Sequence, residues 1–236
     1  MHLITDIGNT LIKTAIFHEN EPVSHEEFTS YDDFRNYYEK NVQHKTIVSS
    51  VANIPEELLI LLKKNNALFF FSAIKIPIKN RYKTPETLGY DRLANAIGAW
   101  SKNPGKNNLI IDCGTCLKFD FLNEKNEYLG GSISPGLIMR ARALQHYTDR
   151  LPLVEPLPEP ALIGDSTTSS ILSGVCNGMT GEINAMIERY EKEYGEMMIH
   201  LTGGDSSFFA ETLKNTIFAD RFLTLRGLNE VLKFNA

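Results

Sequence analysis

The chain has 236 residues, of which 42% are hydrophobic and 22% charged, and its formal net charge is −5. These values are ordinary for a compact protein with one large domain or two modest ones. The charge gives no broad cationic surface, so we expect no nucleic-acid partner and a phosphate site that is local. No apolar run approaches the roughly 18 residues that cross a bilayer, so we also expect no membrane partner.

The N-terminal segment alternates between apolar strands and a polar turn. Leu3–Thr5 and Leu11–Phe17 are the apolar runs, and Asp6–Thr10 separates them. This order predicts a β-hairpin with an acidic residue and a glycine at its bend. Polar residues interrupt the segment and no basic leader is visible, so we expect no export signal and a cytoplasmic location.

Helical and strand-like patterns alternate after this hairpin. Apolar residues recur at helical spacing around Phe34–Tyr38 and Leu58–Leu62, and a strand-like run, Thr46–Val51, lies between them. The apolar spacing over 93–100 predicts an amphipathic helix that ends at the turn 103–105. This alternation is typical of an α/β protein, in which helices pack on sheets.

The strand–turn–strand pattern then recurs. Leu109–Ile111 and Cys116–Leu122 are the strands, and Asp112–Thr115 is the turn. A repeated hairpin indicates a tandem duplication, for which we expect domains at 1–104 and 105–236. Two acidic hairpins from two domains can hold one nucleotide from opposite sides of a cleft.

Cys113 and Cys116 form a C-x-x-C pattern within this second hairpin. A redox pair of this kind usually opens a helix, but the residues that follow alternate like a strand. A zinc site needs further ligands, and Cys176 is the one remaining cysteine. We therefore expect neither redox nor metal chemistry from the cysteines, whose number fits a reducing compartment.

The rest of the second half predicts an extended proline-rich segment, a helix, a buried strand that ends in Gly-Gly, and a short terminal helix. These expected elements are Pro152–Pro160, 183–190, Ile199–Thr202 and 228–232.

The first hairpin contains residue types that suit a nucleotide triphosphate. Gly8 lets backbone amides approach phosphate oxygens, Asn9 and Thr10 offer neutral donors, and Lys13 offers a point charge. Asp6 suits a hydrated Mg²⁺ that is bound through water. The same residue types also suit a plain tight turn, so this hairpin alone leaves both interpretations open.

The paired D-x-G hairpins resemble the actin, Hsp70 and sugar kinase superfamily. That resemblance implies two tandem RNase H-like (actin-like ATPase) domains, with the active site and ATP in the cleft between them. His200–Asp205, a strand that ends in Gly-Gly, resembles the segment of the superfamily that passes beside the adenosine.

Four motifs together are similar to the type III pantothenate kinases in the same order, over residues 3 to about 205. They are Asp6–Lys13, Leu88–Arg92, Asp112–Asp120 and Gly130–Leu137. The resemblance implies a kinase that transfers phosphate from ATP to pantothenate, giving 4'-phosphopantothenate in the first step of coenzyme A biosynthesis.

The Leu88–Arg92 motif contains the residues expected to carry the chemistry. Asp91 is a carboxylate suited to accept the proton of an attacking alcohol, and the resemblance assigns it that catalytic role. Arg92 can bind a carboxylate or phosphate through two parallel hydrogen bonds. Without the resemblance, Asp91 also suits the positive end of a helix dipole and Arg92 a surface ion pair.

The resemblance further implies the remaining ligand contacts. ATP is expected to contact Asp6, Ile7, Gly8, Asn9, Thr10, Leu11, Ile12, Lys13 and Thr115. Pantothenate is expected to contact Tyr82, Gly89, Tyr90, Asp91, Arg92 and Thr167. Asp6 is expected to hold Mg²⁺ through water, and Asp112 a monovalent cation, K⁺ or NH₄⁺. Thr167 is expected to reach the site of a neighbouring subunit, which implies a homodimer with composite active sites.

The second hairpin departs from the family pattern at two positions. Cys116 replaces an alanine and is small enough to be nearly neutral. Lys118 replaces a threonine, and its charge either helps to bind phosphate or faces solvent. The expected cation dependence is therefore least certain at this hairpin.

Three alternatives keep part of this pattern. Another small-molecule kinase or a phosphohydrolase of the superfamily would keep both hairpins, but Leu88–Arg92 argues against it. A regulatory or accessory protein that binds nucleotide without turnover is disfavoured by Asp6, Asp91 and Asp112. An RNase H-like nuclease would cluster its carboxylates around two metals and have a basic surface. This chain divides its carboxylates between two halves and has no basic stripe, so we disfavour a nuclease.

Overall fold

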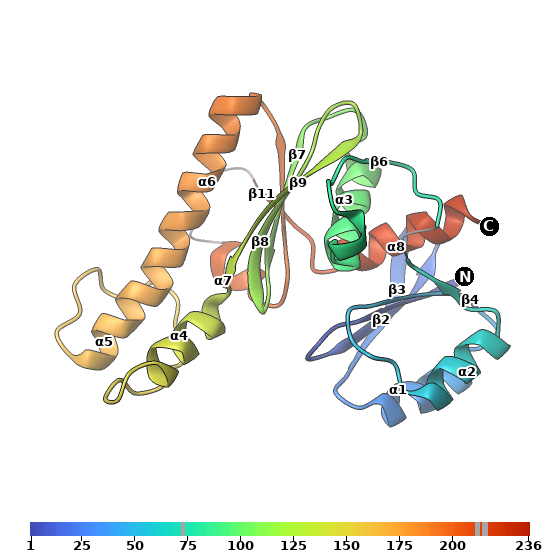
Figure 1. Ribbon diagram of the computed structural model, residues 1–236, viewed down its shortest axis with the longest axis horizontal. Coiled ribbons are helices and arrows are strands. Elements are labelled where there is room, and N and C mark those ends of the chain that lie inside the picture. Colours follow the sequence, from blue (N-terminus) through green and yellow to red (C-terminus); the bar gives the residue numbers. More distant parts are fainter. Residues whose placement is uncertain (72–73, 211–212, 214–216) are drawn as a thin grey trace. The chain divides into compact units, whose positions relative to one another are not determined.

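The computed structural model describes residues 1–71, 74–210, 213 and 217–236. The chain divides into two compact units (Figure 1). The first comprises Met1–Pro104, Asn126–Tyr128 and Phe222–Ala236, and the second comprises Gly105–Lys125 and Leu129–Arg221. The first unit ends at Pro104 in its main segment, as in the expected 1–104 domain. The C-terminal segment Phe222–Ala236 belongs to the first unit, whereas the sequence interpretation assigned it to a 105–236 domain.

The sheet of the first unit has five strands in the order β3-β2-β1-β4-β5. β1 pairs antiparallel with β2 and parallel with β4, and β2 continues antiparallel into β3. The predicted first hairpin is thus the centre of this sheet. The strands are β1 His2–Ile7, β2 Ile12–His18, β3 Glu21–Phe28, β4 Lys45–Ser50 and β5 Leu68–Phe69.

One face of this sheet is covered by α1 (Tyr31–Glu39) and α2 (Glu56–Lys64). Ser30 caps α1 by accepting hydrogen bonds from the backbone of its first turn, which fixes where the helix begins. The core between the helices and the sheet consists of Leu3, Ile7, Ile12, Phe34, Tyr38, Val48, Leu58 and Leu62.

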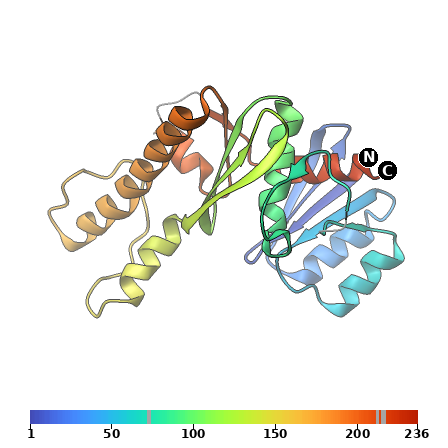
Figure 2. The same ribbon diagram turned by 45° about the horizontal axis from the view of Figure 1, so that its top comes forward.

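The opposite face is covered by α8 (Leu223–Phe234), which packs against α3 (Tyr90–Lys102), as Figure 2 shows. The two helices cross at Gly98 and Gly227. A Cβ on Gly227 would lie 1.8 Å from the Ala94 carbonyl oxygen, so only glycine permits this approach. The apolar face of α8 therefore finds its partner in the first unit, which explains why the C-terminal segment belongs there.

The second sheet has the order β11-β10-β7-β8-β9-β6. β7 pairs antiparallel with β8, which forms the predicted second hairpin, and parallel with β10. The short β6 pairs with Glu127 and Tyr128, the part of β9 that is counted with the first unit. The strands are β6 Lys79–Asn80, β7 Asn108–Cys113, β8 Cys116–Leu122, β9 Glu127–Pro135, β10 Met198–Thr202 and β11 Ile217–Ala219.

The helices of the second unit pack on this sheet around one core. The predicted helix is α6, and its Ile183 and Ile187 are buried while Met186 and Tyr190 are partly buried against the same core. A short π-helical turn, Ser173–Asn177, joins α5 to α6. The helices are α4 Leu137–His146, α5 Thr167–Leu172, α6 Gly178–Tyr194 and α7 Ser206–Ala210. Within the described residues, no helix has both the length and the apolar character needed to span a membrane.

Candidate active site

The first hairpin presents its polar residues at one end of the sheet. Asp6 of β1 lies opposite Lys13 of β2 and beside Ser49 of β4, so these side chains share one face. The turn is closed by a hydrogen bond of 3.0 Å from the Gly8 amide to the Leu11 carbonyl. A Cβ on Gly8 would lie 3.1 Å from that carbonyl oxygen, which accounts for the glycine.

The residues expected to bind ATP in this hairpin have three different environments. Ile7 and Ile12 are buried in the core of the first unit and anchor the turn. Asn9 and Thr10 are exposed at its tip, and Asp6, Gly8, Leu11 and Lys13 are half-buried. The hairpin thus presents exposed polar donors on a fixed base.

Asp91 is the second residue of α3, whose N-cap residue is Gly89. Its Oδ1 accepts a hydrogen bond of 2.9 Å from the backbone N–H of Arg92. A Cβ on Gly89 would lie 2.6 Å from this oxygen. Gly89 therefore leaves the space that the Asp91 carboxylate occupies, at the helix end whose dipole favours a negative charge.

Aromatic side chains surround the neighbouring Arg92. Its guanidinium carbon lies 5.7 Å from the centroid of the Tyr82 ring, within the range of a cation–π contact. The Tyr82 ring contacts Tyr128, and Tyr90 contacts Phe70. Arg92 is 4% exposed, so its planar charge is held in a partly apolar setting that suits an anionic ligand group.

In the second hairpin Asp112 of β7 lies opposite Lys118 of β8. The Lys118 ammonium donates a hydrogen bond of 2.8 Å to Asp112 Oδ2. Lys118 thus does not simply face solvent, and its direct partner is a carboxylate. Thr115 is exposed at the tip of the turn.

Two glycines outside the hairpin hold it in place. Gly136 precedes α4 and donates its amide to the Thr115 carbonyl, and a Cβ there would lie 2.2 Å from the Gly114 carbonyl oxygen. Gly203 follows β10 with a φ of +95°, and a Cβ there would lie 2.4 Å from the Cys113 carbonyl oxygen. Both positions therefore require glycine, which gives a physical reason for the Gly130–Leu137 motif and for the Gly-Gly after β10.

The cysteines of the second hairpin do not form a reactive pair. Cys113 is buried and Cys116 is partly buried, and both are free thiols. Burial, together with the negative charges of Asp112 and Asp205, raises the pKa of Cys113 far above its ordinary value. Cys113 is therefore a neutral core thiol.

The strand before Gly203 leads to a second acidic residue. Burial raises the pKa of Asp205, whose backbone N–H donates to the Cys113 carbonyl. His200 lies in the interior of the unit, where its Nε2 is 2.9 Å from Asn108 Oδ1. His200 is therefore a core histidine with a fixed partner.

Thr167 is exposed at the first position of α5. The capping box of Ser166 and Ser169 fixes the start of this helix. Leu162 and Ile163, just before it, are 81% and 84% exposed.

The structure therefore brings the expected residues together in groups within each unit. The first unit holds the hairpin Asp6–Lys13 and the group of Tyr82, Asp91 and Arg92, and the second holds Asp112 of β7 and Thr115 of the turn that follows. Among the described residues, no cluster of three or more His, Cys, Asp or Glu side chains could hold a metal ion. The sequence interpretation missed the Lys118–Asp112 pair, although the short turn between β7 and β8 would have predicted it.

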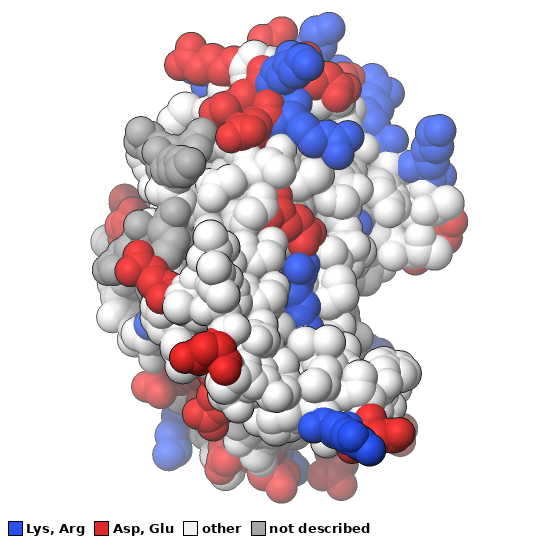
Figure 3. Space-filling model, turned by 90° about the vertical axis from the view of Figure 1, so that its left-hand side faces the viewer, with Lys and Arg blue, Asp and Glu red and all other residues white. Residues whose placement is uncertain are grey.

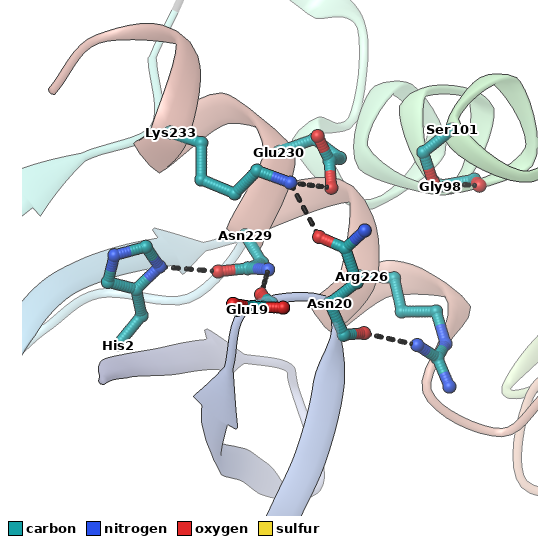
Figure 4. Close-up of polar contacts among 9 residues, drawn as sticks. All are labelled: His2, Glu19, Asn20, Gly98, Ser101, Arg226, Asn229, Glu230 and Lys233. Atoms are coloured by element: carbon teal, nitrogen blue, oxygen red, sulfur yellow. Dashed lines mark hydrogen bonds and ion pairs between the residues drawn. The ribbon is translucent and has the colours of Figure 1, made fainter.

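A polar hollow in the first unit is lined by none of the expected site residues. Its lining is Asn20, Glu21, Ser101, Lys102, Arg226, Asn229 and Glu230. Figure 4 shows that lining residues bind neighbouring residues: Asn229 bridges His2 and the Glu19 carbonyl, and Lys233 donates to Asn20. These bonds fasten α8 to the β2–β3 turn, so the hollow has a structural role.

Comparisons with known proteins support one family. Residues 2–189 match the family model described as type III pantothenate kinase. A type III pantothenate kinase from Christiangramia forsetii is 46% identical over 242 residues, covering 100% of this chain and 99% of that protein. One from Bacteroides fragilis is 41% identical, covering 100% of this chain and 98% of that protein.

Solved structures show the same fold at lower identity. A Baf family protein from Campylobacter jejuni has a TM-score of 0.64 and 21% identity, covering 99% of this chain and 98% of that one. An inorganic polyphosphate/ATP-glucomannokinase from Arthrobacter has a TM-score of 0.51 and 10% identity, covering 100% of both chains. The predicted two-domain actin-like ATPase fold is thus confirmed, and the chain belongs to the type III pantothenate kinase family.

Proposed function

We propose that this chain transfers the γ-phosphoryl group of MgATP to the primary hydroxyl of pantothenate, the first step of coenzyme A biosynthesis. The observation that carries this proposal is the Leu88–Arg92 segment at the start of α3, in a chain that matches the family model over residues 2–189. A kinase of this fold needs no covalent intermediate, because positioning and charge neutralisation supply most of the catalysis.

Asp91 is proposed as the general base that orients the hydroxyl. Asp91 is half-buried, and its carboxylate accepts a hydrogen bond from the Arg92 amide. Gly89 has no side chain, which leaves room for the carboxylate. A carboxylate in this position can accept the hydroxyl proton as the alcohol attacks phosphorus.

Arg92 is proposed to bind the carboxylate of pantothenate. Its guanidinium is buried against the Tyr82 ring, so it can offer a planar pair of donors without much loss of side-chain freedom. Tyr82, Gly89 and Tyr90 are half-buried around it and are proposed to form the walls of the substrate site.

Each of the two hairpins is proposed to contribute contacts to ATP. Gly8, Asn9 and Thr10 offer backbone and side-chain donors to the phosphates, Lys13 offers a positive charge, and Thr115 contributes from the second hairpin. Asp6 is a half-buried oxygen donor at a strand end, which suits a Mg²⁺ bound through water. Mg²⁺ offsets phosphate charge in the transition state.

A cytoplasmic homodimer is also part of this proposal. Most of the exposed large apolar side chains of the second unit lie within residues 129–163. Figure 3 shows the face that carries α4, α5 and α6, where uncharged residues cover most of the middle. An exposed apolar surface of this kind suits a second copy of the chain, from which Thr167 would reach the substrate. The apolar residues are Leu129, Ile133, Ile138, Met139, Tyr147, Leu153, Leu157, Leu162 and Ile163.

The decisive experiment measures ADP release from MgATP with and without pantothenate, for the natural chain and Asp91→Asn. We expect stimulation by pantothenate in the natural chain and a fall in kcat of roughly 10²- to 10⁴-fold in Asp91→Asn, because the base is lost. Asp33→Asn is the matched control, since Asp33 is an exposed aspartate in the first turn of α1. It should leave the rate unchanged.

Two results would contradict the proposal. ATP binding without any stimulation by pantothenate would point to a regulatory protein or to another acceptor alcohol. Full activity of Asp91→Asn would remove Asp91 from the chemistry and leave the substrate assignment standing.

A further inference from the structure

Lys118 stands where the family usually has threonine, and its ammonium occupies a defined place. β7 and β8 pair so that Asp112 and Lys118 lie directly opposite each other and point to the same face. Lys118 Nζ is 2.8 Å from Asp112 Oδ2, and the two side chains are only 15% and 12% exposed. This is a largely buried ion pair.

The backbone of β8 at Lys118 is fixed by the residues on either side. Leu117 and Phe119, on either side of it in β8, are 0% and 1% exposed and belong to the core of the second unit. Their burial sets the register and the facing of the strand, because a shift by one residue would expose both. Lys118 therefore projects from the same face of the hairpin as Asp112.

The environment of Asp112 requires a positive charge. The residue is 8% exposed, and its Oδ1 lies close enough to Gly203 that a Cβ there would be 2.6 Å away. A carboxylate so far removed from water is costly unless a cation accompanies it.

The family resemblance implies a bound K⁺ or NH₄⁺ for this role. A lysine ammonium has the same single charge as these ions, is similar to them in size, and binds the same oxygen. It is also tethered, so it is present at high effective concentration whatever the salt. A free ion at Asp112 Oδ2 would have to displace an ammonium that is already in hydrogen-bond contact, so this residue set does not fit a free monovalent cation there.

We propose that the Lys118 ammonium takes the place of the monovalent cation at Asp112, so that phosphoryl transfer by this chain does not depend on K⁺ or NH₄⁺. The inference rests on the proposed kinase function. Lys118 acts through Asp112, which lies near the end of β7, three residues before the expected ATP contact Thr115.

The first test compares initial rates of ADP release with pantothenate in KCl, NH₄Cl, NaCl and choline chloride at equal ionic strength. We expect the four rates to agree within about twofold, because equal ionic strength keeps screening constant. A rate that rises tenfold or more in KCl over choline chloride would overturn the inference. Absence of turnover in all four salts would count against the kinase function, and the unfolding measurement below tests the inference without turnover.

The second test removes the ammonium. Lys118→Thr restores the family's usual residue and opens space beside Asp112, so K⁺ should now bind. We expect KCl to raise the unfolding midpoint of this variant by roughly 2–8 °C over choline chloride, because a ligand of the native state stabilises it. KCl should also restore a rate that falls by about tenfold or more in choline chloride. The natural chain should show neither response.

Two further variants separate charge from packing. Lys118→Met keeps the length of the side chain without charge or space, so we expect a low rate that KCl does not restore. Lys125→Thr removes an exposed lysine from the β8–β9 turn and should behave as the natural chain. A Lys118→Thr variant that responds to K⁺ in neither rate nor unfolding would overturn the inference.

Discussion

Cys113 illustrates how a side chain's surroundings determine its chemistry. Its C-x-x-C pattern with Cys116 suggests reactivity, but burial and two nearby carboxylates raise the pKa of the thiol well above 9.0. A raised pKa keeps the thiol neutral, so its contribution to stability is present below pH 9.0 and is lost as pH rises towards the native value. Reactive cysteines need the opposite, a lowered pKa and access to solvent.

We therefore expect iodoacetamide at pH 8 to modify Cys116 in the folded protein at least about 100-fold faster than Cys113. The partly buried Cys116 reports access to the hairpin, and mass spectrometry of the peptides measures both sites. In guanidinium chloride the two rates should converge. Fast labelling of native Cys113, or its oxidation to a disulfide with Cys116, would contradict this assignment.

At the scale of the element, the crossing of α3 and α8 depends on two glycines. A Cβ on Gly98 would lie 2.3 Å from the Leu223 carbonyl oxygen, and one on Gly227 would lie 1.8 Å from the Ala94 carbonyl oxygen. These obstacles are backbone atoms, which cannot rotate away. Alanine at either position therefore has to push the two helices apart.

We expect Gly227→Ala to lower the free energy of unfolding by about 3 kcal/mol or more, measured by urea titration. Gly181→Ala is the matched control, because Gly181 also lies inside a helix, α6, and a Cβ there meets nothing within 4 Å. The control should stabilise the protein by roughly 0.5–1 kcal/mol, since alanine is the better helix former. Equal effects of the two changes would show that the helices tolerate a wider crossing.

The sequence predicted the elements better than their partners. Both hairpins, the helix after Gly89 and the helix that contains Ile183 follow from local periodicity, and the structure confirms them. The packing of α8 on α3 could not be predicted, because it depends on a close approach between residues more than a hundred positions apart. The apolar spacing of α8 shows that it needs a partner but does not say which one.

In the candidate site, too, the sequence predicted individual residues better than the contacts between them. Asp91 was expected from its motif, but the role of Gly89 in leaving room for its carboxylate emerged only from the geometry. Gly136 lies in the Gly130–Leu137 motif, but the sequence assigned it no role. The structure shows that its amide donates to the Thr115 carbonyl of the second hairpin. Such supporting contacts bridge segments that are distant in sequence, so no local pattern encodes them.

For the molecule as a whole, the proposed homodimer gives a prediction that joins assembly to activity. Ile163→Asp places a charge on a residue that is 84% exposed, in the apolar stretch before Thr167. We expect dimerisation to weaken by roughly tenfold or more, or about 1.4 kcal/mol, and activity to fall at low protein concentration. Sedimentation velocity and ADP release, measured over the same concentration range, check both effects.

Ile60→Asp is the control for a change of charge alone. Ile60 is 59% exposed on α2 of the first unit, outside the apolar stretch. It should alter neither the sedimentation coefficient nor the rate. A natural chain that is monomeric and fully active would rule out composite sites and leave Thr167 without its proposed role.

The return of the C-terminal helix to the first unit also affects how the protein forms on the ribosome. α8 is synthesised after every element of the second unit, yet it covers α3 and one face of the first sheet. All residues of the second unit lie within 105–221, so its chain is complete before α8 is made. The unit whose synthesis begins first is therefore the one that finishes folding last.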